Sequence, residues 1–83
     1  MTEEDRNTIL KEAALLARAH YKRNTRLAEN YRKTNPMTEL ACRRDAAAVA
    51  SGAICLDLLK LAGVDSNEAL RILEMEGADS KFI

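Results

Sequence analysis

The sequence predicts an all-α protein with two long antiparallel helices and a short third helix. Residues 46–62 form an almost uninterrupted run of apolar, helix-forming residues, with Asp57 and Lys60 among their three polar side chains. From Leu10 to Tyr31, small and apolar residues recur every three or four positions, which is the period of a helix. The single proline of the chain stands between these two segments. A helix that is apolar on nearly every side has to be surrounded by other helices, and this requirement fixes the fold class.

The first helix is predicted at about residues 3–33. Thr2 can cap its start, with Asp5 in the reciprocal position of a capping box and three acidic residues on the positive end of the helix. Asn24 and Thr25 are weak helix formers within this segment, so a kink or short break there is one alternative.

The second helix is predicted at about residues 36–62. Asn35 is a good N-cap, and Pro36 fits the first turn of a helix. At the other end, Gly63 can adopt the left-handed conformation that closes a helix and lets Val64 pack back on its last turn.

The third helix is predicted at about residues 66–76, followed by Gly77. Asp65 or Ser66 can cap it, and Glu68 stands in the box position after Asp65. A short turn between two long helices makes an antiparallel hairpin, in which residue i lies roughly opposite residue 69 minus i. This rule places small residues opposite one another at a close crossing near Gly52. It also places one polar layer inside the seam, formed by His20, Asn24, Arg44 and Asp45.

The size and composition of the chain predict one domain, residues 1–83, completed by oligomerisation. A protein of 83 residues is near the lower limit for a core that is stable alone, and this chain has only one Phe, two Tyr and no Trp. Small proteins without disulfides or metals often bury the missing apolar surface against a second subunit. We therefore expect a homo-oligomer.

Charge is distributed unevenly although the net charge is zero. Residues 1–44 have ten basic and six acidic residues, which gives +4, whereas residues 45–83 have three and seven, which gives −4. The positive charge concentrates in residues 18–44, which we interpret as a surface for a protein partner. A solvated helix face, or attraction between the two halves of the molecule, would explain the same pattern. The partner-binding candidates are Arg18, Lys22, Arg23, Arg26 and Lys33.

Three further polar residues of the first helix allow three interpretations. His20 and Asn24 are four residues apart on the apolar stripe, where a polar side chain can set the register and oligomeric state. A kink at Asn24 would instead turn both side chains to solvent. A third interpretation is a binding site for an anionic small molecule, with His20, Tyr21 and the neighbouring cations as donors and a stacking ring.

Residues for catalysis or metal binding are scarce, so we expect a protein that is not an enzyme and has no cofactor. His20 is the only histidine, and Cys42 and Cys55 lack the spacing of a zinc site. The sequence has no glycine-rich phosphate loop, paired-carboxylate motif or metalloprotease motif. Both cysteines are expected to be reduced structural thiols.

Nucleic-acid binding is the principal alternative function. Residues 58–73 resemble a helix-turn-helix motif, with its turn at Ala62-Gly63-Val64, but the would-be recognition helix has four acidic residues against Arg71. Phosphate neutralisation dominates DNA affinity, so these acids are unfavourable. The basic segment 18–33, with two interleaved tyrosines, is the better candidate for such binding.

The apolar run is shorter than the roughly 20 residues that span a bilayer, and the N-terminus is acidic where an export signal would be basic. We therefore expect a cytoplasmic protein with no membrane contact. The function that these observations favour is that of a non-enzymatic regulatory protein, which binds a macromolecular partner through its basic surface at residues 18–44. A nucleic-acid-binding regulator and an oligomer that sequesters an anionic small ligand are the alternatives.

Overall fold

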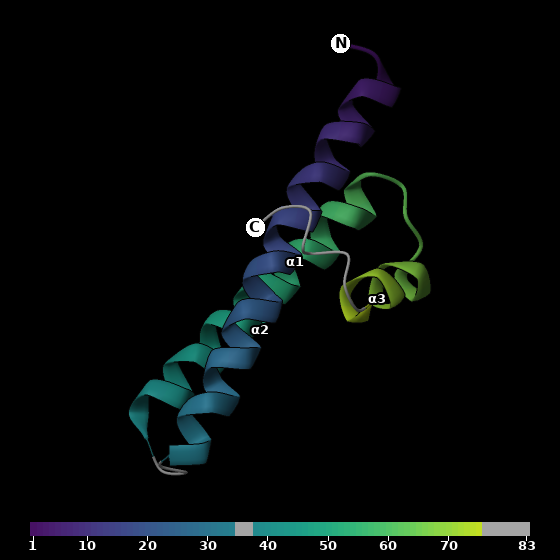
Figure 1. Ribbon diagram of the computed structural model, residues 1–83. Helices are drawn as coiled ribbons and strands as arrows, with labels where there is room; N and C mark the ends of the chain where they lie inside the picture. Colours follow the sequence, from purple (N-terminus) through teal and green to yellow (C-terminus); the bar gives the residue numbers. More distant parts are fainter. Residues whose placement is uncertain (35–37, 76–83) are drawn as a thin grey trace.

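The computed structural model describes residues 1–34 and 38–75, and every regular element among them is a helix. Helix α1 comprises Glu3–Thr34, α2 comprises Glu39–Leu61 and α3 comprises Ser66–Glu74. Helices α1 and α2 lie side by side as a long antiparallel hairpin, and the short α3 packs against one flank of it (Figure 1). The all-α class, with two long helices and a short third one, is confirmed.

Helix α1 begins at the predicted capping box and continues without interruption to Thr34. The backbone N–H of Asp5 donates to the Thr2 hydroxyl at 3.1 Å, and the Asp5 carboxylate accepts from the Thr2 N–H at 3.3 Å. The helix is unbroken across Asn24, because Thr25 donates its hydroxyl hydrogen to the Tyr21 carbonyl at 2.9 Å and so keeps its side chain within the helix. The predicted alternative of a break at this point is therefore wrong.

Helix α2 begins three residues later than predicted. Its N-cap is Thr38, whose hydroxyl accepts a hydrogen bond from the backbone N–H of Leu40 at 3.2 Å. A threonine hydroxyl followed by an acidic first turn satisfies the exposed N–H groups of a helix well, and Glu39 supplies that acid. The caps expected at Asn35 and Pro36 fall outside the described residues.

The turn between α2 and α3 has the predicted left-handed glycine. Gly63 has a φ of 88°, its N–H donates to the Lys60 carbonyl at 3.0 Å, and the N–H of Val64 donates to the Leu59 carbonyl at 2.9 Å. These two bonds define a Schellman motif, in which the last carbonyls of the helix are satisfied by the residues that follow it. Val64 then packs against the core, as predicted.

Helix α3 is capped at its start by Asp65, whose carboxylate accepts from the backbone N–H groups of Asn67 at 3.1 Å and Glu68 at 3.4 Å. The helix ends at Glu74, two residues earlier than predicted, and Gly77 lies outside the described residues. The core beneath α3 is built from few and mostly small side chains: Ala14, Cys55, Leu59, Ala69 and Leu73.

The close approach predicted at Gly52 exists, but a side chain makes it. A Cβ atom at Gly52 would lie 3.1 Å from Cδ1 of Tyr21 and 3.8 Å from Cδ2 of Leu73. Side chains of a helix lean toward its N-terminus, so the Tyr21 ring covers the preceding turn of α1, which the antiparallel register brings opposite Gly52. The glycine therefore makes room for an aromatic ring between two helices and a third.

The predicted polar layer forms only in part. The guanidinium of Arg44 donates to the side-chain oxygen of Asn24 at 3.1 Å, and Asn24 is buried. Asp45 pairs instead with Arg32, and His20 is exposed to solvent. Asn24 thus links the two long helices, which fits the register interpretation, whereas His20 takes no part in the seam.

Candidate functional site

The basic segment of α1 divides into side chains that face α3 and side chains that face solvent. Arg18, Tyr21 and Lys22 reach the last turn of α3, more than fifty residues away in the sequence. Arg23, Arg26 and Lys33 are exposed. The predicted partner-binding set therefore does not form one surface, and its two parts have to be considered separately.

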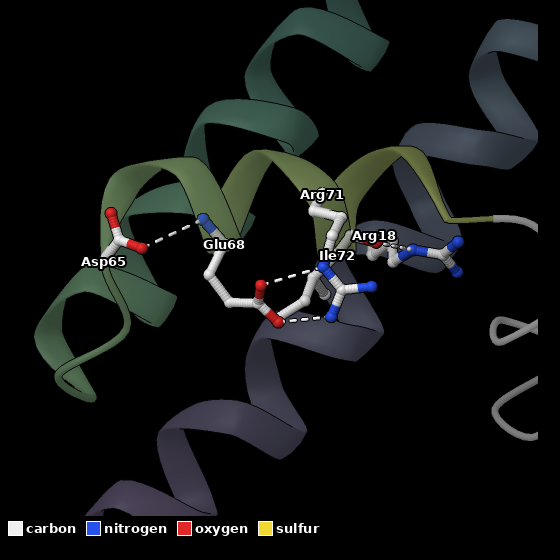
Figure 2. Close-up of polar contacts among 5 residues, drawn as sticks. All are labelled: Arg18, Asp65, Glu68, Arg71 and Ile72. Carbon is white, nitrogen blue, oxygen red and sulfur yellow. Dashed lines mark hydrogen bonds and ion pairs between the residues drawn. The ribbon is translucent and has the colours of Figure 1, made fainter.

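Arg18 is the most buried of these residues, with an exposed fraction of 0%. Its Nε atom donates to the backbone carbonyl of Ile72 at 2.7 Å, as Figure 2 shows. Carbonyls in the last turn of a helix lack partners within the helix, and a cation there also offsets the negative end of the helix dipole. Arg18 therefore holds α3 on the hairpin, and the expectation that it belongs to an exposed partner-binding surface is corrected.

Tyr21 and Lys22 engage the same end of α3 through Glu74. The Tyr21 hydroxyl donates to Oε1 of Glu74 at 3.3 Å, and Nζ of Lys22 donates to the Glu74 backbone carbonyl at 3.2 Å. Burial raises the pKa of Tyr21, and the nearby Glu74 carboxylate raises that pKa further. Tyr21 stays protonated at neutral pH for this reason and remains a hydrogen-bond donor. We call Arg18, Tyr21 and Lys22 the α3 clamp.

The sequence alone did not reveal the α3 clamp, although one local signal was present. The cation that α3 has in its own last turn, Arg71, is bound elsewhere: its Nε donates to Oε2 of Glu68 at 2.9 Å (Figure 2). This bond lowers the pKa of Glu68 and keeps the pair ionised. The C-terminal carbonyls of α3 consequently need cations from another element, and the basic stretch of α1 supplies them.

The solvent-facing cations form the remaining candidate surface. Arg26 and Lys33 are seven residues apart, about two helical turns, and so lie on the same side of α1. Arg23 stands one turn before Arg26 and flanks it. All three are exposed and form no hydrogen bond or ion pair within residues 1–34 and 38–75. We call these three residues the basic surface of α1.

The other cations of residues 18–44 have partners within the chain. Arg32 pairs with Asp45 and Arg44 binds Asn24, and both interactions join α1 to α2. Arg43 pairs with Glu39 at 2.8 Å on the surface of α2. Much of the positive charge that the sequence concentrates in this region therefore stabilises the hairpin, as the interpretation of attraction between the two halves anticipates.

The residues expected at an anionic ligand site are dispersed. His20 faces solvent, Tyr21 is turned inward against Gly52, and Lys22 is held at α3. An apolar groove of about 400 Å³ does lie beside α3, lined chiefly by Leu15, Leu59, Val64, Ile72 and Met75. None of the predicted ligand residues lines this groove.

The two cysteines differ sharply in their environments. Cys42 is exposed and Cys55 is buried, and both are free thiols. Burial raises the pKa of the Cys55 thiol, against the opposing effect of the Arg18 guanidinium. A buried thiol with a raised pKa is a poor nucleophile at neutral pH. Among the described residues, no group of three or more His, Cys, Asp or Glu side chains could hold a metal ion.

None of the helices, as far as the structure describes them, is long and apolar enough to cross a membrane. Comparison with known proteins gave no match to a family model, to a curated protein or to a solved structure.

Proposed function

We propose that this chain is a non-enzymatic regulatory protein that binds an acidic surface of a protein partner through the basic surface of α1. The observation that supports this most is the exposure of Arg23, Arg26 and Lys33 without any partner among the described residues. Exposed, unpaired cations on a rigid helix steer and orient association with a complementary surface. They add little to the stability of the fold, about 0–1 kcal/mol each.

Nucleic-acid binding has less support. A protein that binds DNA tightly contacts about 6–10 phosphates, and the basic surface of α1 offers three cations. Single-strand binding also needs exposed aromatic rings on which bases stack. Tyr21 fills the space beside Gly52 instead of facing solvent. On α3, Arg71 is bound to Glu68, so the helix-turn-helix alternative also lacks an available cation.

We also propose that the protein acts as a homo-oligomer in the cytoplasm. The exposed apolar side chains of α2, among them Val49, Ile54 and Leu61, support self-association. The unpaired thiol of Cys42 on the surface suits a reducing compartment.

The proposed partner surface is tested by reversing two of its charges. The full chain and the variant Arg23→Glu/Arg26→Glu are used as baits in nuclease-treated extract of the native host, and the captured proteins are compared quantitatively. A partner that the wild-type protein captures is then purified and titrated with both. We expect the variant to bind about tenfold more weakly or worse, because like charges then face each other. Its helicity and melting temperature should be nearly unchanged.

Two control variants decide between the alternatives. Arg6→Glu/Lys11→Glu reverses two exposed charges on the same helix outside the basic surface and should leave binding intact. Arg71→Glu tests the helix-turn-helix alternative and should also leave binding intact. The proposal is wrong if the Arg23/Arg26 variant binds like the wild type, or if nuclease treatment removes the interaction.

A further inference from the structure

The outer face of α2 is apolar and has no covering element among the described residues. Helices α1 and α3 pack on the side of α2 that carries Ala48, Gly52, Cys55 and Leu59. On the opposite side Ile54 is 54% exposed and Leu61 is 58% exposed, and Val49, at 71%, borders this side. Hydrophobic side chains gathered on one face at this level of exposure are typical of a protein interface.

The residues of this face follow the spacing of a helix–helix seam. Positions 43, 46, 50, 53, 57 and 61 succeed one another by three or four residues, and each of them is exposed. Such spacing places them in one stripe along the helix, as in a coiled coil. We call this stripe, with Ile54 beside it, the outer face of α2: Arg43, Ala46, Ala50, Ala53, Ile54, Asp57 and Leu61. The stripe is about 27 Å long at 1.5 Å per residue.

The charges on this face are placed symmetrically about Ala50. Arg43 precedes Ala50 by seven residues and Asp57 follows it by seven, so each lies about 10 Å from it along the helix. Arg43 already binds Glu39, whereas Asp57 forms no ion pair with any residue in the ranges 1–34 and 38–75. A surface whose opposite charges flank a central point in this way is complementary to itself when rotated by half a turn.

We propose that the outer face of α2 binds the same face of a second copy of this chain, antiparallel about a two-fold axis at Ala50. Arg43 then faces Asp57 of the partner subunit, and the symmetric pair forms on the other side of the axis. Ala46 faces Ile54 of the partner subunit, so a small side chain meets a large one and the helices can approach closely. A parallel arrangement in the same register would set Arg43 against its own copy and Asp57 against its own copy, which like charges oppose.

Self-complementarity is what identifies the occupant. An isologous two-fold interface requires that one patch fit itself, with residue i against j and j against i. The pairs 43 with 57, 46 with 54 and 47 with 53 all satisfy this condition about residue 50. An unrelated partner helix would not require the charges of α2 to be symmetric. The inference rests on the proposed homo-oligomer and adds its surface, its orientation and its register.

The dimer leaves the proposed partner surface available. Helix α1 covers the opposite side of α2, so Arg23, Arg26 and Lys33 remain exposed on each subunit. The two functions can therefore be tested separately, one by the mass of the particle and the other by partner binding.

The register is tested by exchanging the charges. The masses of the wild type, Arg43→Asp, Asp57→Arg and the double variant are measured by analytical ultracentrifugation over a range of concentrations. We expect the wild type to have twice the 9.2 kDa mass of the chain. Each single variant should dissociate at about tenfold lower concentrations of salt-free repulsion or bind itself about tenfold more weakly, because like charges then meet twice per dimer. The double variant should regain the wild-type mass.

Mixing the two single variants gives the sharpest result. A subunit with Arg43→Asp has two acidic positions on its face, and a subunit with Asp57→Arg has two basic ones. In an antiparallel pair centred on Ala50 every acidic position of one subunit meets a basic position of the other. An equimolar mixture should therefore form a heterodimer at concentrations where each variant alone is monomeric.

Control measurements separate this proposal from the proposed function. Arg23→Glu/Arg26→Glu should keep the doubled mass, and circular dichroism should show unchanged helicity in every variant. The proposal is overturned if the wild type is monomeric, if the single variants keep the doubled mass, or if neither the double variant nor the mixture restores it. Loss of partner binding in the Arg23/Arg26 variant with no effect of the α2 exchanges on mass would overturn the dimer and leave the partner surface standing.

Discussion

Gly52 and Tyr21 are the pair of residues on which the contact between the hairpin and α3 depends most directly. The ring lies where a side chain of residue 52 would lie, and Leu73 closes the space from α3. Gly52→Leu should therefore destabilise the fold by about 1–3 kcal/mol, the usual cost of overpacking. Tyr21→Ala empties that space, so the double variant Tyr21→Ala/Gly52→Leu should be more stable than the sum of the two single changes predicts. Chemical denaturation of the four proteins measures this coupling, and strictly additive effects would contradict it.

Tyr21 also predicts a loss of stability at alkaline pH. Its pKa is raised in the folded protein, first by burial and then by Glu74, so the folded state disfavours the phenolate more than the unfolded chain does. The stabilisation is complete below the unfolded pKa of about 10 and is lost as the pH rises through the folded value. The melting temperature should fall in that range.

The matched variants for this prediction are Tyr21→Phe and Tyr31→Phe. Tyr21→Phe should flatten the alkaline fall in melting temperature, because no phenolate can then form beside Glu74. Tyr31→Phe should retain the fall. An unchanged profile in Tyr21→Phe would mean that other groups, such as the lysines, cause the loss.

Sequence reasoning at the residue scale identified Gly52 and Asn24 correctly but misassigned Arg18. A glycine within a helix and an asparagine on an apolar stripe are each unusual where they stand, so their positions imply a close neighbour and a polar contact. An arginine in a basic segment has no such local anomaly. Its long side chain reached a carbonyl of Ile72 in a helix that the hairpin rule does not position, so its burial could not be inferred.

Helix α3 is the element that depends most on others for its stability. It has nine residues, and isolated helices shorter than about 12 residues are marginal in water. Asp65 satisfies its first N–H groups, and the α3 clamp satisfies carbonyls of its last turn. We expect α3 to open locally before the hairpin unfolds.

The thiol of Cys55 reports this opening, because α3 covers it in the folded state. Asp65→Ala removes the N-cap at a cost of about 1 kcal/mol, which corresponds to about a fivefold larger fraction of open α3. In a Cys42→Ser background, alkylation of Cys55 should accelerate by that factor, whereas Ser66→Ala should change it little. An alkylation rate that Asp65→Ala leaves unaltered would show that Cys55 becomes accessible by another motion.

The element boundaries show which local signals were sufficient. The capping box at Thr2 and the left-handed cap at Gly63 were predicted because each is specified by residues adjacent in sequence. The start of α2 was not, since both Asn35 and Thr38 are good N-caps and only the geometry of the hairpin selects between them. The attachment of α3 depended on contacts across the whole chain and was left open by the sequence.

The molecule as a whole is elongated, with extents of 49 × 21 × 21 Å. Its radius of gyration of 14.2 Å exceeds the roughly 12 Å expected of a compact chain of this length. A hairpin only two helices wide cannot enclose α2, whose composition is apolar on nearly all sides. Burial of its outer face therefore has to come from outside the chain.

Linkage between folding and self-association should make the melting temperature depend on protein concentration. The folded dimer is favoured by mass action, so the melting temperature of the wild type should rise by a few degrees for roughly each tenfold increase in concentration. Asp57→Arg, which weakens the dimer, should show a flatter dependence. Differential scanning calorimetry at several concentrations measures both, and a concentration-independent transition in the wild type would contradict the linkage.

The bonds between α1 and the end of α3 join residues 52–54 positions apart in the chain, and this separation has a kinetic consequence. The adjacent turns of the hairpin can close early, whereas contacts across so long a loop carry a larger entropic cost and form late. Interactions that are absent from the folding transition state affect the unfolding rate and not the folding rate. Lys22→Met should therefore steepen the rate of escape from the native state while the refolding rate stays nearly constant, so that the end of α3 acts as the timer of the protein's lifetime.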